Sequence, residues 1–66
     1  MEKTIKVKGM HCKSCEMLIG DSVSEIRGVE GVKADHKKGV VSVRLKDDGL
    51  MGKVRAAIEK EGYGVE

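Results

Sequence analysis

Cys12 and Cys15 are the only two cysteines in this chain, and they are separated by two residues. Two thiolates at this spacing can converge on one soft metal ion. The same spacing also occurs in redox-active thiol pairs and in half of a zinc site. Here the pair follows a stretch of alternating apolar residues and precedes a stretch with helical periodicity. This position, between a predicted strand and a predicted helix, favours a metal-binding loop.

The donor atoms indicate which ion such a loop would hold. A structural zinc site usually takes four protein ligands, whereas this chain offers two cysteines and at most two histidines, His11 and His36. Monovalent copper is a soft ion that two thiolates can satisfy. We therefore expect Cu(I) on Cys12 and Cys15, with Ag(I) and Hg(II) able to take its place chemically.

Alternating apolar residues predict the strands that position this loop. Residues 3–8, 31–36 and 40–46 each place apolar side chains on one face and polar side chains on the other. Residues 37–39 have the composition of a hairpin turn, with Gly39 where a positive φ angle is needed. Residues 63–65 leave room for only a short final strand.

Two segments have the 3.6-residue periodicity of amphipathic helices. The first runs from Cys15 to Ile26, with Ser14 as its predicted N-cap and Gly28 as the residue after its end. The first turn of this helix would lower the pKa of Cys15, because free amide groups and the positive end of the helix dipole favour a thiolate. The second helix follows an Asp47–Asp48 cap and ends at Gly62, with apolar positions at Leu50, Val54, Ala57 and Ile58.

The order strand, helix, strand, strand, helix, strand predicts an α+β sandwich of the split βαβ, or ferredoxin-like, type. Two helices cover one face of a four-stranded antiparallel sheet, and residues 1–66 form a single domain. With right-handed crossovers, the cysteine loop, the 37–39 turn and the 62–64 loop lie at one end of the sandwich.

The motif Gly9-Met10-His11-Cys12-Lys13-Ser14-Cys15 resembles the GMxCxxC signature of heavy-metal-associated domains, the small copper chaperones and the N-terminal modules of copper-transporting P-type ATPases. The resemblance extends to Gly28-Val29, Gly39 and Gly62-Tyr63. It implies that Cys12 and Cys15 bind Cu(I). It also implies that the ion passes to the metal-binding domain of a metal-transporting P-type ATPase through a three-coordinate thiolate intermediate.

The resemblance also bears on the expected roles of three further residues, Met10, Tyr63 and His11. Met10 matches a methionine that packs beneath the loop, and Tyr63 matches an aromatic residue near the site in bacterial members. His11 departs from the pattern, because copper domains often have Thr there and domains that handle zinc or cadmium have Asp. His11 is therefore a solvated loop residue, a third ligand or a contact to a metal ion bound by the partner, and Zn(II) and Cd(II) stay open as alternative ions.

Length and composition restrict the other function classes. With 66 residues, no Phe or Trp and one Tyr, the core must be aliphatic and has no room for a large cofactor. No segment approaches the roughly 20 apolar residues of a membrane span, and the N-terminus lacks the apolar stretch of a signal peptide. We expect a cytoplasmic protein, not an enzyme, without membrane insertion, acting as a monomer or as a dimer bridged by a shared ion. The starting methionine favours a free protein over an excised ATPase domain.

Several residues have plainer or competing interpretations. His36 is expected at the rim of the core and away from the start of the first helix, while Met10, Met17 and Met51 are expected to be fillers rather than ligands. Exposed acids on the first helix would steer a partner with a basic rim; they are Glu16, Asp21 and Glu25.

Two functions of other classes compete with metal binding. A basic outer sheet face would fit an RNA-binding module, since such modules share this topology; its residues are Lys6, Lys8, Lys33, Arg44 and Lys46. RNA-recognition sheets stack bases on aromatic side chains, however, and this face has none, so we expect no nucleic-acid partner. A thiol–disulfide carrier is the other rival, although the chain lacks the proline associated with thioredoxin-like folds.

Overall fold

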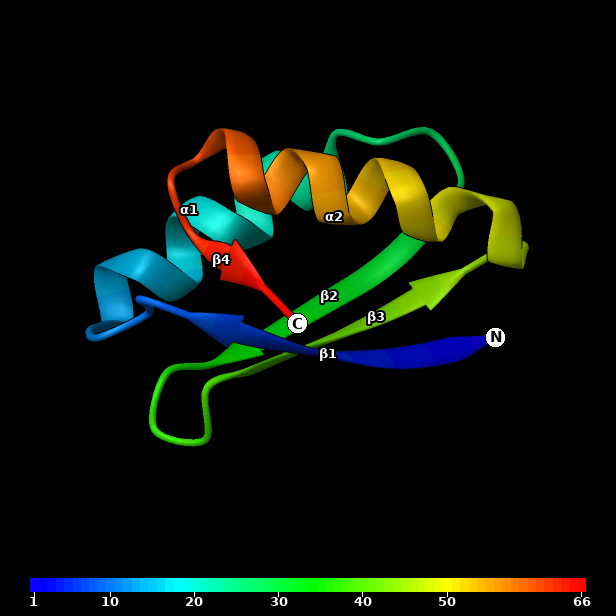
Figure 1. The fold of residues 1–66 in the computed structure, drawn as a ribbon. Coiled ribbons are helices and arrows are strands. Elements are labelled where there is room, and N and C mark those ends of the chain that lie inside the picture. Colours follow the sequence, from blue (N-terminus) through cyan, green and yellow to red (C-terminus); the bar gives the residue numbers. More distant parts are fainter.

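Two helices pack on one face of a four-stranded antiparallel sheet, which confirms the predicted ferredoxin-like fold (Figure 1). The computed structural model describes all residues from 1 to 66. Its elements are β1 (Glu2–Lys8), α1 (Lys13–Ser24), β2 (Val29–Asp35), β3 (Val40–Leu45), a short 3-10 helix η1 (Asp48–Leu50), α2 (Met51–Lys60) and β4 (Gly64–Val65). The strands lie in the order β2-β3-β1-β4.

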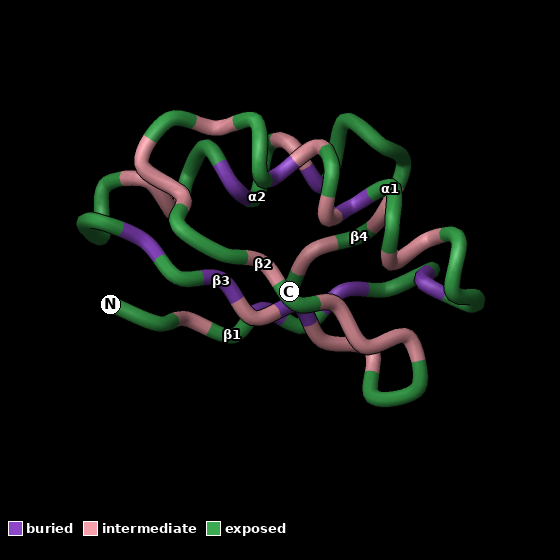
Figure 2. Tube along the Cα trace, turned by 180° about the vertical axis from the view of Figure 1, so that it is seen from behind, coloured by how far each residue is buried: buried purple, intermediate pink, exposed green.

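The core lies between the sheet and the helices and is built from aliphatic side chains and one methionine. Alternate residues of β1 and β3 point into it, and each helix contributes one buried stripe, as Figure 2 shows by the buried segments on the facing sides. The ten buried residues are Ile5, Val7, Met10, Ile19, Val23, Val41, Val43, Leu45, Val54 and Ile58. Branched side chains of this kind pack densely without ring-sized gaps, so the interior needs no aromatic residue.

The boundaries of α1 differ from the prediction. Cys12 occupies the N-cap position with an extended backbone, and no side chain caps the helix, so the prediction of Ser14 as N-cap was wrong. The helix ends at Ser24, and Ile26 turns back toward the core through a bond from its N–H to the Val23 carbonyl. Gly28 therefore lies beyond the position after the helix end, in the turn that leads into β2.

The second helical segment agrees with its predicted start and end. The Asp47 side chain accepts a hydrogen bond of 2.8 Å from the Gly49 N–H and so caps η1, which continues directly into α2. Gly62 follows α2 with a φ angle of 95°, a conformation that only glycine adopts without strain. Local sequence signals were sufficient to place this helix.

The β2–β3 turn and the segment before β4 lie at the same end of the molecule as the cysteine loop, as predicted. Gly39 has a φ angle of 68°, and its carbonyl accepts a hydrogen bond of 2.8 Å from the N–H of Val7 in β1. At the other edge of β1, Val7 and Lys8 pair with Val65 and Gly64. The last residues before the loop are therefore held from both sides.

None of the helices has the length and apolar character required for a membrane span.

Candidate metal-binding site

The loop between β1 and α1 is anchored by one buried residue. Met10 is only 4% exposed and belongs to the core, whereas His11 and Cys12, which follow it, are exposed. The methionine thus fixes the base of the loop and brings the next residues to the surface. This agrees with the packing role expected for Met10, which belongs to the buried core.

The two cysteines lie together but in different surroundings. Their Sγ atoms are 3.4 Å apart and both thiols are free. Cys12 is exposed, while Cys15 is half-buried and packs against the core. The Cys15 N–H also bonds to the Cys12 carbonyl at 3.1 Å, which forms the first turn of α1. One sulfur is consequently fixed to the helix, and the other is free to move with the loop.

Hydrogen bonds lower the pKa of Cys15 to about 7. The Tyr63 hydroxyl contributes most, followed by the backbone of His11 and then by the Cys12 side chain. The same contact with the Cys15 sulfur raises the pKa of Tyr63 to about 12. A lowered pKa for Cys15 agrees with the sequence prediction. Its largest cause, however, is a hydrogen bond from a tyrosine at the other end of the chain rather than the helix start alone. A large fraction of Cys15 is therefore thiolate at neutral pH, the form that binds metal.

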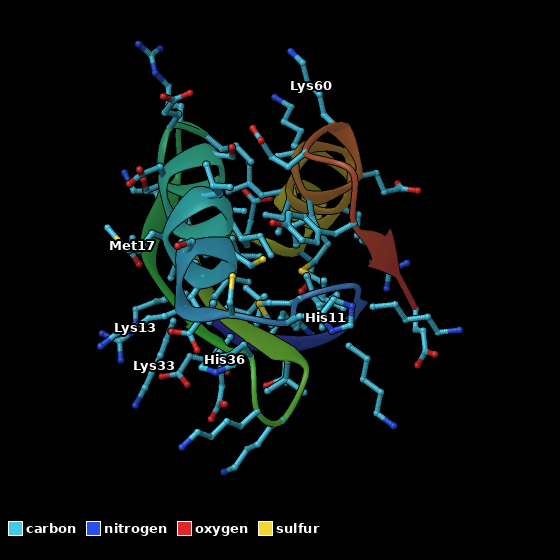
Figure 3. All side chains as sticks on the ribbon, turned by 90° about the vertical axis from the view of Figure 1, so that its left-hand side faces the viewer. His11, Lys13, Met17, Lys33, His36 and Lys60 are labelled. Atoms are coloured by element: carbon cyan, nitrogen blue, oxygen red, sulfur yellow. The ribbon has the colours of Figure 1, made fainter.

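His11 is exposed on the loop beside α1, where Figure 3 shows it at the end of the molecule that carries the site. The structure contains no group of three or more His, Cys, Asp and Glu side chains arranged to hold one metal ion. The donor set assembled by this conformation is the pair of sulfurs.

His36 lies close to the start of α1, so the prediction that it lies away from that helix start was wrong. Its backbone N–H donates to Glu16 Oε2 at 2.7 Å, and its ring Nδ1 lies 2.7 Å from the same oxygen. β2 ends at Asp35, and the turn that follows bends His36 toward the first turn of α1. These bonds lower the pKa of Glu16, with the backbone N–H contributing most. No local pattern signals a contact between residues 20 positions apart.

The sequence profile of the heavy-metal-associated domain family matches residues 4–64. This span contains the loop, both cysteines, Tyr63 and nearly all of the sheet. The chain belongs to the heavy-metal-associated domain family.

Relatives of this heavy-metal-associated domain include proteins named for copper and one named for zinc. It is 37% identical to the copper chaperone CopZ of Bacillus subtilis over 97% of this chain and 94% of the relative. It is 32% identical to a probable copper-exporting P-type ATPase of Archaeoglobus fulgidus, over 98% of this chain but only 8% of the ATPase. Among solved structures, the N-terminal domain of ZntA in the Zn(II) form has a TM-score of 0.91 and 26% identity, covering 98% of this chain and 88% of the other.

The outer face of the sheet in this heavy-metal-associated domain carries basic residues that are partly neutralised. Lys8 pairs with Glu66 at 3.1 Å and Arg44 pairs with Glu2 at 3.1 Å. The only aromatic residue, Tyr63, is at Cys15 rather than on this face.

The acidic patch expected on α1 is smaller than predicted, because the Glu16 side chain is only 21% exposed and contacts His36.

Proposed function

We propose that this protein is a metallochaperone that binds Cu(I) between the Sγ atoms of Cys12 and Cys15 and delivers it to the metal-binding domain of a copper-transporting P-type ATPase. The pair of sulfurs 3.4 Å apart, one anchored and one exposed, is the observation that carries this proposal. The family, the similarity to CopZ and the similarity to one segment of a copper-exporting ATPase support it. Residues 1–66 act as one such domain.

The geometry suits loading by a small movement of Cys12. Bonds between a metal ion and a thiolate are about 2.3 Å long, so two sulfurs bound in line lie about 4.6 Å apart. The sulfurs must therefore separate by about 1 Å from the present 3.4 Å. Because Cys12 is exposed and Cys15 packs against the core, Cys12 makes this movement.

The same asymmetry suits release. A thiolate from the partner adds to the exposed ion while Cys15 still holds it, which gives a three-coordinate intermediate. Cys12 then leaves first, since its side chain has fewer contacts. A second thiolate of the partner adds to the ion, and Cys15 leaves after it. The ion keeps at least two sulfur ligands throughout, metal–sulfur bonds are exchanged one for one, and the protons that the partner thiols lose are taken up by the cysteines that leave. The protein thus acts by binding and exchange rather than by catalysis.

A reducing compartment is required, because both thiols must stay reduced to bind Cu(I). We place this function in the cytoplasm, with a monomer as the transferring species. Two copies sharing one ion through four sulfurs would form when copper is scarce relative to protein.

Anaerobic titration with Cu(I), in competition with a chromophoric chelator, tests the proposal. Wild type is expected to bind one Cu(I) per monomer, and Cys12→Ser and Cys15→Ser are expected to lose at least a hundredfold in affinity because one thiolate cannot replace two. Ser14→Ala, a matched change between the two cysteines, is expected to bind normally. Wild-type affinity in both cysteine variants would disprove the assigned ligands, and absence of Cu(I) binding in wild type would disprove the function.

Zinc is the second candidate ion, favoured by the likeness to the ZntA domain in its Zn(II) form. Zn(II) prefers four ligands, whereas the conformation described here assembles two sulfurs. A Zn(II) titration of wild type and His11→Ala decides between the two ions. Zn(II) binding that exceeds Cu(I) binding and that depends on His11 would replace copper with zinc in the proposal.

A further inference from the structure

The two ends of the metal loop are tied to the same turn, residues 36–39. At the start of the loop, the Val7 N–H donates to the Gly39 carbonyl at 2.8 Å. At its end, the Glu16 carboxylate, one residue after Cys15, accepts bonds from the His36 N–H and approaches the His36 ring, both at 2.7 Å. Figure 3 shows His36 beside the first turn of α1. The turn between β2 and β3 therefore spans the base of the loop.

This turn is braced by its own hydrogen bonds. Asp35 Oδ1 accepts bonds from the N–H groups of Lys37 and Lys38 at 3.0 and 3.1 Å. The Asp35 carbonyl accepts a bond of 2.9 Å from the Gly39 N–H. A side chain that bonds its own backbone two or three residues on fixes a tight turn. The turn can thus hold the loop in place rather than follow its movements.

The first turn of α1 has few other anchors. No side chain caps its N-terminus, and Ile19 is the first fully buried residue of the helix, more than one turn further on. Cys15 contributes partial packing against the core. An uncapped helix start frays readily, because its first amide groups lack partners. The polar tertiary contacts of this turn with the rest of the fold are the two contacts from Glu16 to His36 and the contact of the Cys15 sulfur with the Tyr63 hydroxyl.

We propose that Glu16 and His36 form a clasp that positions the Cys15 sulfur and thereby sets how fast the site exchanges its ion. This inference rests on the proposed function. Glu16 and His36 are positioning residues, since they act on the site through the first helical turn. With the clasp closed, Cys15 keeps a fixed place while Cys12 moves. With the clasp open, both sulfurs move and the ion leaves more easily.

Substitutions at the two positions are expected to give graded effects. Glu16→Ala removes both contacts, and we expect about tenfold faster loss of Cu(I) to a competing chelator, the lower end of the effect of removing groups that orient metal ligands. His36→Ala keeps the backbone contact and is expected to have a smaller effect of the same sign. Glu16→Gln keeps an oxygen acceptor for both contacts and is expected to stay within about twofold of wild type.

Two further measurements separate positioning from general stability. In the metal-free protein, amide hydrogen exchange of residues 13–16 and alkylation of Cys15 are both expected to speed up in Glu16→Ala. Asp47→Ala weakens the fold at the opposite end, and it is expected to leave both rates and Cu(I) release unchanged. In the Glu16→Ala background, His36→Ala is expected to add nothing, because the shared contact is already lost.

The clasp is overturned if Glu16→Ala releases Cu(I) at the wild-type rate, or if Asp47→Ala speeds release as much as Glu16→Ala does. Full additivity of the two alanine substitutions would also overturn it. If wild type binds no Cu(I), the proposed function fails by itself. Amide exchange and alkylation of the metal-free protein then still decide whether the clasp holds the first turn.

Discussion

The two helical segments begin in different ways: the start of α2 is stabilised by a side-chain cap, whereas the start of α1 carries a candidate metal ligand instead of a cap. The α2 segment begins with a local cap, in which the Asp47 carboxylate bonds the backbone two residues on. The α1 segment has Cys12 at the equivalent position and no side-chain cap. Its first turn is held instead by Glu16 and by His36, 20 residues further along the chain. The N-cap position that would normally stabilise a helix is occupied by a residue suited to metal binding.

Among substitutions that affect the two helices, Ile19→Ala is expected to change the free energy of unfolding most, because it removes the first fully buried side chain of α1. Loss of a buried Ile side chain destabilises a fold by about 2–5 kcal/mol, a large share of the stability of a 66-residue domain. Urea unfolding monitored by circular dichroism measures this loss. A change below about 1 kcal/mol would show that packing is not what holds α1 in place.

Asp47→Ala is expected to have the next largest effect. Removal of an N-cap carboxylate destabilises a protein by about 1 kcal/mol, because the Gly49 N–H loses its partner. Asp48→Ala is the matched control, since its only ion pair, with Lys3 at 3.3 Å, is exposed. Equal losses in the two variants, measured by urea unfolding, would contradict the capping role of Asp47.

Cys12→Ser is expected to stabilise the metal-free protein by up to about 1 kcal/mol while it removes metal binding. Serine is a strong N-cap residue, and Cys12 already has the extended backbone that an N-cap needs. Ser14→Ala is the control, because Ser14 lies inside α1 and caps nothing. If Cys12→Ser lowers the free energy of unfolding, then the cysteine itself supports the helix start and the trade between stability and function is absent.

Tyr63→Phe is expected to change the fold least, because only one hydroxyl is removed at a half-buried position. Its effect is instead on Cys15, whose pKa rises above about 7 when the hydrogen bond that lowers it most is lost, while the bonds from His11 and Cys12 remain. At pH 7 the thiolate fraction of Cys15 then falls below about one half. The pH dependence of Cys15 alkylation measures this shift when proteins with Tyr63 and with Tyr63→Phe are compared in the same Cys12→Ser background, because loss of the Cys12 thiol itself removes one hydrogen bond that lowers the pKa. An unchanged midpoint would assign the low pKa to the helix start and the neighbouring backbone.

The comparison also explains what could be predicted from the sequence. The hairpin turn at Gly39, the Asp47 cap and the end of α2 at Gly62 depend on interactions within a few residues, and these predictions were correct. Alternating apolar residues predicted the strands, although β2 runs from Val29 to Asp35 rather than over residues 31–36. The position of Cys15 in the first helical turn followed in the same way, whereas burial of Met10 was implied by the family resemblance. The start and end of α1 were wrong, because this helix has no local cap and closes through Ile26.

Contacts between distant residues were beyond the sequence patterns. The sequence around Glu16 predicts an exposed acidic patch and the sequence around His36 predicts a residue at the core rim, since neither neighbourhood indicates the contact between them. The family resemblance implied that Tyr63 lies near the site, but it did not predict a contact with the Cys15 sulfur. Its effect on the thiol depends on the hydroxyl reaching the sulfur from the segment before β4.

The exposure of Cys12 has one further consequence for the proposed cargo. The aliphatic core beneath the loop closes around Met10, so an ion on the two sulfurs would sit at the protein surface. Small cellular thiols such as glutathione would have the same access to that ion as a partner domain. Retention would then depend on chelation by two sulfurs on one backbone rather than on shielding, and a partner would have to outcompete free thiols by docking.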